Sequence, residues 1–164
     1  MKNAKILVVL IIFISSGPVF AEKSKNQRMS EAAGVVSTMK FFIGRAAKDC
    51  KSIMGESDEY MHSIVNDWLE RNGKYTKSAE NWIRIFATAV AEKKGFEEGQ
   101  SLANWFMIEA QENGIEKVKS VIRGSVEEEI DNCAKYKVDV GNGVYDINES
   151  TKYYEQIKEL EQRY

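Results

Sequence analysis

Apolar residues recur every three or four positions along most of the chain, which is the spacing of one face of an α-helix. Glycines and N-capping residues divide this pattern into segments, and the only proline, Pro18, lies near the N-terminus. Five helices are predicted, over residues 30–54, 57–72, 76–94, 97–113 and 115–134. The links between them are short, so we expect mostly antiparallel neighbours.

The periodicity changes after Cys133. Residues 135–140 alternate between polar and apolar, and the Gly-Asn-Gly sequence at 141–143 follows. This pattern fits either a short β-hairpin or an extended loop. Ser150 then caps a last predicted helix with Tyr154, Ile157, Leu160 and Tyr164 on one face. The sequence therefore predicts an all-α fold, a single-domain bundle of five to six helices over residues 22–164.

The first 21 residues have the organisation of a secretory signal peptide. Lys2 and Lys5 precede nine consecutive apolar residues, Ile6–Ile14, and small residues lead to Ala21. Nine residues are too few to cross about 30 Å of hydrocarbon, so a membrane anchor is disfavoured. We expect cleavage after Ala21, a periplasmic location, and no stable membrane insertion of the mature protein.

Charge argues against nucleic acid as a partner. The chain has 23 Lys and Arg against 25 Asp and Glu. Removal of the signal peptide takes away two lysines and no acid, which changes the formal net charge from −2 to −4. Nucleic-acid binding depends on clustered Lys and Arg, so we expect no nucleic-acid partner.

The two cysteines, Cys50 and Cys133, both fall on apolar helix faces. In an oxidising compartment such residues usually pair, so a disulfide is predicted. Redox catalysis is disfavoured because the two residues do not form a Cys-x-x-Cys motif.

Few residues offer catalytic chemistry. His62 is the only histidine and is predicted to be solvated on the polar side of its helix. Carboxylates are scattered, and no pair of them can be assigned to one cleft. We therefore expect no enzymatic activity, no cofactor and no metal site.

The segment Trp68-Leu69-Glu70-Arg71-Asn72 resembles a motif, but structural roles explain it: Trp68 in the core, Arg71 and Asn72 at a helix end. Trp68, Trp82 and Trp105 all fall on apolar faces, which favours packing over a stacking platform for sugars or bases.

Tyrosines concentrate near the C-terminus, and tyrosine is enriched at protein interfaces. The non-helical pattern after Cys133 makes residues 135–147 the predicted recognition element. An acidic patch at 127–131 is the second candidate, although a merely solvated face also explains it. The candidate partner-binding residues are Tyr136, Asp139, Asn142, Tyr145, Asp146, Glu127 and Glu128.

A signal peptide, a cysteine that closes the first helix, and a late cysteine followed by tyrosine (Cys133-Ala134-Lys135-Tyr136) together resemble small periplasmic immunity proteins. Those proteins neutralise peptidoglycan-cleaving effectors of type VI secretion. The resemblance implies a non-enzymatic binder that blocks an active site of a protein partner with a loop or an acidic surface. The alternative is a periplasmic assembly factor that binds a peptide or envelope component in an inter-helix groove. An exposed apolar groove would favour this alternative over a polar convex patch.

Overall fold

The computed structural model describes residues 24–164, so the predicted signal peptide lies outside the described residues. Within 24–164 the chain forms helices and no strand, as the all-α prediction requires. The five helices are α1 (Lys25–Met54), α2 (Asp58–Lys94), α3 (Phe96–Val121), α4 (Val126–Gly141) and α5 (Tyr154–Arg163).

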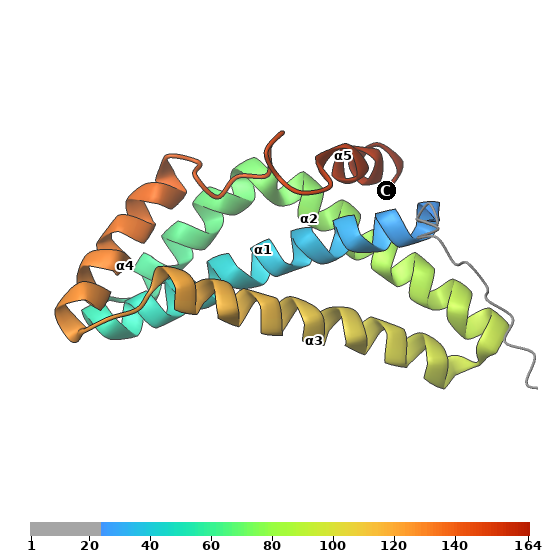
Figure 1. Cartoon of the computed structure of the whole chain (residues 1–164), viewed down its shortest axis with the longest axis horizontal. Coiled ribbons are helices and arrows are strands. Elements are labelled where there is room, and N and C mark those ends of the chain that lie inside the picture. Colours follow the sequence, from blue (N-terminus) through green and yellow to red (C-terminus); the bar gives the residue numbers. More distant parts are fainter. Residues whose placement is uncertain (1–23) are drawn as a thin grey trace, which may run out of the picture.

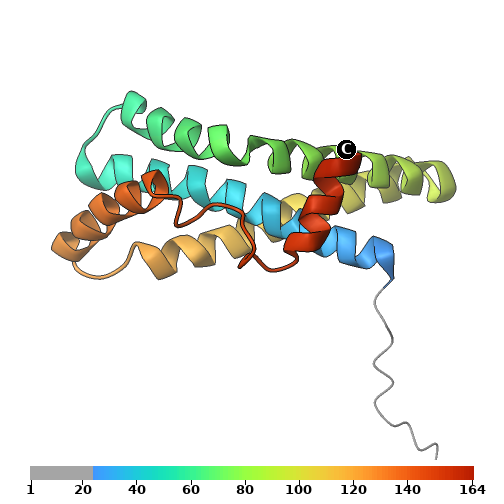
Figure 2. The same cartoon turned by 90° about the horizontal axis from the view of Figure 1, so that it is seen from above.

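Three long helices lie side by side, and each of α1, α2 and α3 contacts the other two (Figure 1). The chain reverses between α1 and α2 and again between α2 and α3, so α1 and α3 run in the same direction. At one end α4 packs on α1 and α2, and at the other end α5 crosses the same two helices (Figure 2). The segment 142–153 joins α4 to α5 along the bundle.

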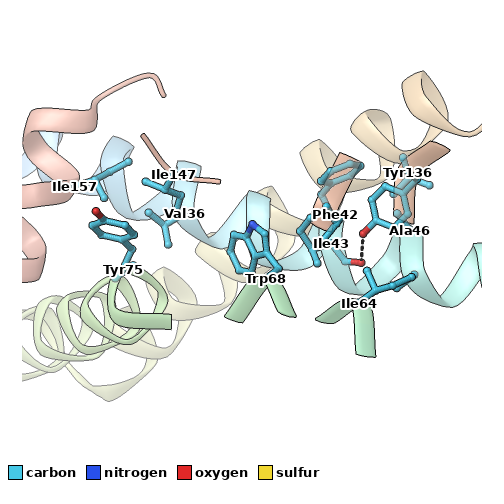
Figure 3. Packing of buried hydrophobic residues seen from close by; sticks show 14 of the residues in the cluster. Val36, Phe42, Ile43, Ala46, Ile64, Trp68, Tyr75, Tyr136, Ile147 and Ile157 are labelled. Carbon is cyan, nitrogen blue, oxygen red and sulfur yellow. Dashed lines mark hydrogen bonds between the residues drawn. The ribbon is translucent and has the colours of Figure 1, made fainter. Parts of the chain in front are cut away.

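The core lies where α1 meets α2 and the C-terminal elements (Figure 3). Alanines on α1 have no exposed surface and let the neighbouring helices approach closely: Ala32, Ala33, Ala46 and Ala47. Larger side chains fill the space on either side, among them Phe42, Trp68 and Tyr136. Burial of such aromatic side chains is worth about 1.5–3 kcal/mol or more each.

Several helix ends lie where the sequence predicts them. Ser57 caps α2 by accepting a hydrogen bond from the Tyr60 backbone N–H at 3.4 Å. Gly55 ends α1 in the left-handed conformation, with φ 68°. Lys93 and Lys94 occupy the last turn of α2, where the helix dipole stabilises positive charge.

The predicted break at Asn72-Gly73 is wrong, because α2 continues through it as one helix of 37 residues. Asn72 is buried, and its side chain bonds partners outside the helix. Tertiary contacts therefore override the local tendency of an Asn-Gly pair to end a helix.

The boundaries of the next helices also differ from the prediction. Gly114 does not end a helix; it lies buried in α3, where an added Cβ would come within 2.5 Å of the Phe41 ring. The break falls instead at Gly124, whose φ of 121° favours glycine. Ser125 then caps α4 in a capping box with Glu128.

Neither of the two predictions for residues 135–147, a short β-hairpin or an extended loop, describes the whole segment. Residues 135–141 continue α4, because Cys133, Tyr136 and Val140 follow helical spacing and are all buried. The alternation of polar and apolar residues suggests a strand because it counts Val138 as an inward-facing residue. Val138 is in fact exposed on α4. Residues 144–153 form turns rather than a second strand.

The predicted disulfide is confirmed: Cys50 pairs with Cys133, with their Cα atoms 5.2 Å apart. The disulfide joins Cys50, near the end of α1, to Cys133 in the middle of α4. The sequence places Cys133 near the end of a helix that begins at Ile115. Both residues are fully buried.

Candidate functional site

The Trp68–Asn72 cluster holds the segment that follows α4. The Trp68 indole N–H donates to the Tyr145 carbonyl at 2.9 Å, and the Asn72 amide donates to Asp146 Oδ1 at 2.8 Å. In return Asn72 Oδ1 accepts from the Ile147 N–H at 2.8 Å. The structural interpretation of this cluster is therefore correct, although its partners lie about 75 residues away rather than at a helix end.

Arg71 completes this latch, which we define as Trp68, Arg71, Asn72 and Asp146. Its guanidinium donates to Asp146 Oδ2 at 2.7 Å and to the Val140 carbonyl at 2.5 Å. Hydrogen bonding by Asp146 raises the pKa of Arg71. The latch thus ties the end of α4 and the next residues to α2.

We expect Asp146→Ala to lower the free energy of unfolding by about 1–3 kcal/mol, because it leaves the buried Asn72 amide without one partner. Urea unfolding followed by circular dichroism measures the change. Glu149→Ala is the matched control, an exposed acid in the same segment. Equal unfolding midpoints for the two variants would contradict the latch.

Three of the residues predicted to bind a partner instead make contacts within the fold. Tyr136 is 0% exposed, and its hydroxyl donates to the Ile43 carbonyl at 2.8 Å (Figure 3). Burial raises the pKa of Tyr136. Tyr145 is half-buried, with its ring edge-on to Phe42 at 5.1 Å between centroids. Asp146 belongs to the latch.

The other nominated residues remain closer to the surface. Asp139 forms an ion pair with Lys135 at 2.5 Å. Asn142 caps the C-terminus of α4 and is exposed. Glu127 is exposed, while the Glu128 carboxylate accepts a hydrogen bond from the Ser125 N–H at 2.7 Å, which lowers the pKa of Glu128. A binding role for these four residues stays a prediction.

Exposed apolar side chains gather on the hairpin formed by the second half of α2 and the first half of α3. Trp105 is 50% exposed, so the prediction that all three tryptophans pack in the core is wrong for this one, while Trp68 and Trp82 are buried. Contiguous exposed apolar patches mark interaction surfaces, whereas single exposed apolar residues are common on protein surfaces. The set on this hairpin comprises Ile85, Phe96, Trp105, Met107 and Ile108.

Trp105 lines a groove of about 940 Å³ between α1 and α3, which we call the α1–α3 groove. Its apolar lining consists of Val35, Met39, Phe86, Leu102, Trp105 and Phe106. The Trp105 and Phe106 rings pack edge to face at 4.9 Å, which fixes the Trp105 side chain at the rim. The volume lies in the range of about 300–1,000 Å³ typical of ligand sites.

Polar and charged groups complete the groove. Glu31 and Lys117 belong to its two long walls, and Lys152 and Tyr153 border it from the segment before α5. Tyr153 in this lining has a positive φ of 64°, and His62, the only histidine of the sequence, is exposed on α2 as predicted. Apolar side chains beside charged and polar groups suit an amphiphilic ligand.

Metal-ligating side chains are dispersed. Among residues 24–164, no three His, Cys, Asp or Glu side chains come together closely enough to hold a metal ion. In the same part of the chain, no helix is both long enough and apolar enough to cross a bilayer.

Sequence reasoning missed the groove, although one signal for it exists. Residues 105–108 read Trp-Phe-Met-Ile, and four consecutive apolar residues point in directions about 100° apart around a helix. They cannot all face one core, so some must be exposed. Trp105, Met107 and Ile108 are the exposed members and Phe106 is the buried one.

A family model described as "Protein of unknown function (DUF2934)" matches residues 78–111. This stretch is the α2–α3 hairpin that carries the exposed apolar set and most of the groove's apolar lining. No curated protein and no solved structure matches the chain. The match spans about a fifth of the chain, and its description assigns no activity.

Proposed function

We propose that the chain is an exported, non-enzymatic binding protein that holds an apolar segment of a protein partner in the α1–α3 groove. The observation that carries the proposal is the half-exposed Trp105 in a groove that Leu102, Phe106 and Met39 also line. Aromatic side chains in such positions commonly dominate the binding energy of protein interfaces. Export rests on the signal-peptide pattern of residues 1–21.

Of the two binding functions that the sequence leaves open, the groove supports peptide binding by an assembly factor. The immunity function would use a loop or an acidic surface. Tyr136 and Asp146, the core of the nominated loop, are occupied by contacts within the fold. The acidic residues of α4 lie at the opposite end of the bundle from the α2–α3 hairpin tip (Figure 1).

We expect Trp105→Ala to weaken binding of apolar peptides at least tenfold while leaving the melting temperature within a few degrees of the parent. The physical reason is that half of the Trp105 surface already faces solvent, so truncation removes binding area without opening a core cavity. Isothermal titration calorimetry with a pool of apolar heptapeptides measures the affinity.

Ile85→Ala is the matched control, because Ile85 is a large exposed residue of α2 that does not line the groove. Its affinity should equal that of the parent. Equal losses in both variants would point to unspecific surface hydrophobicity. If the parent binds none of the peptides, the proposed function fails.

A further inference from the structure

Lys117 is a half-buried cation that has no acidic partner within residues 24–164. Its ammonium lies 5.2 Å from the centroid of the Phe42 ring and 6.0 Å from that of Tyr145. Burial lowers the pKa of Lys117. Aromatic faces compensate a buried charge only in part, so a carboxylate at this point would be bound favourably.

Lys117 places a positive charge at one end of the groove, so the two ends differ in charge. It is the last α3 residue of the lining, about 12 Å along the helix axis from Glu109 and about 22 Å from Leu102. Glu109 lines the groove before that point, so a negative charge of the ligand is disfavoured there. A ligand that matches this pattern carries a negative charge at one end and apolar groups along the rest.

The polar lining favours a peptide over a plain hydrocarbon chain. Gln27, Ser30, Thr38 and Asn113 contribute hydroxyl and amide groups beside the apolar floor. A peptide main chain has N–H and C=O groups that need such partners, whereas an alkyl chain would remove them from water without replacement. A length of about 22 Å accommodates roughly seven residues of extended chain.

We propose that the α1–α3 groove binds the C-terminal end of an apolar peptide, with the Lys117 ammonium holding the terminal carboxylate and Trp105 covering the preceding side chains. This inference rests on the proposed function, since it specifies which part of a protein partner enters the groove. Lys152 lines the same groove and adds a second positive charge.

The test uses the full mature chain and a pool of heptapeptides with randomised leucine, valine, alanine and phenylalanine positions. The pool is prepared in two forms that differ only at the C-terminus, a free carboxylate and a carboxamide. A third form places glutamate in the middle and keeps the carboxamide. Affinities are measured for the parent, Lys117→Met and Lys117→Arg, and thermal melts show that each variant is folded.

We expect the parent to bind the carboxylate form about tenfold to a hundredfold more tightly than the carboxamide, as for a lost hydrogen bond to a charged group. Lys117→Met should abolish this preference and Lys117→Arg should keep most of it. Equal binding of both forms by the parent would overturn the inference and leave the proposed function standing. Preference for internal glutamate would also overturn it, and no binding of any form would overturn both.

Discussion

Replacement of both cysteines by alanine is expected to lower the free energy of unfolding by roughly 4–5 kcal/mol. The disulfide closes a loop with a sequence separation of 83 residues, and loss of the cross-link frees that chain in the unfolded state. Because whole domains of this size are stable by about 5–15 kcal/mol, the variant should be close to the limit of folding. Urea unfolding of Cys50→Ala/Cys133→Ala against the parent gives the difference.

Two further readouts separate the cross-link from simple loss of side-chain volume. The denaturant dependence of the unfolding free energy should increase in the double variant, since an uncrosslinked unfolded chain exposes more surface. A reducing agent should destabilise the parent and leave the double variant unchanged. Alkylation of two free thiols in the unreduced native protein would contradict the pairing.

The helices could be predicted because their signals are local. Apolar residues at spacings of three and four define the buried faces of α1 and α2, and capping residues such as Ser57 act within one turn. The disulfide was also predictable, because both cysteines lie on such faces. The helix faces and caps depend on residues only a few positions apart, whereas the disulfide joins two such faces across 83 residues.

The places where prediction failed are decided by contacts distant in the sequence. Asn72 stays within a helix because Asp146 and Ile147, more than 70 residues later, bind its side chain. Tyr136 turns toward the core, where its hydroxyl donates a hydrogen bond to the carbonyl of Ile43, 93 residues earlier. A period-two pattern competes with a helical one over residues 135–140, and only these long-range partners decide between them.

The candidate site could not be predicted from the sequence either, because it depends on contacts between helices that are distant in the sequence. Trp105 and Lys117 are ordinary members of a helical pattern until α1 is placed alongside α3. The hydrophobic run at 105–108 signals an exposed apolar group on α3, but it does not tell which helix provides the opposite wall. The groove is therefore a property of the packing of three helices rather than of any motif.

Trp68→Ala is expected to cost about 3–5 kcal/mol of stability, as for a large aromatic side chain truncated in a core. Trp68 is 1% exposed, and its indole N–H bonds the Tyr145 carbonyl at 2.9 Å. The truncation removes packing between α1 and α2 and also one of the bonds that hold the segment after α4. Guanidinium unfolding followed by far-UV circular dichroism measures the loss without relying on tryptophan fluorescence.

Trp68→Phe divides this loss into its two parts, since phenylalanine keeps most of the ring packing but cannot donate to the Tyr145 carbonyl. We expect it to cost about 1–3 kcal/mol. Trp105→Ala is the matched control for tryptophan removal, because that side chain is half exposed and should change stability by less than about 1 kcal/mol. Equal unfolding midpoints for Trp68→Ala and Trp105→Ala would contradict the placement of Trp68 at the centre of the core. In peptide binding we expect the reverse: Trp105→Ala lowers the affinity, and Trp68→Phe leaves it unchanged. This result would show that the core residue acts on stability and the groove residue on binding.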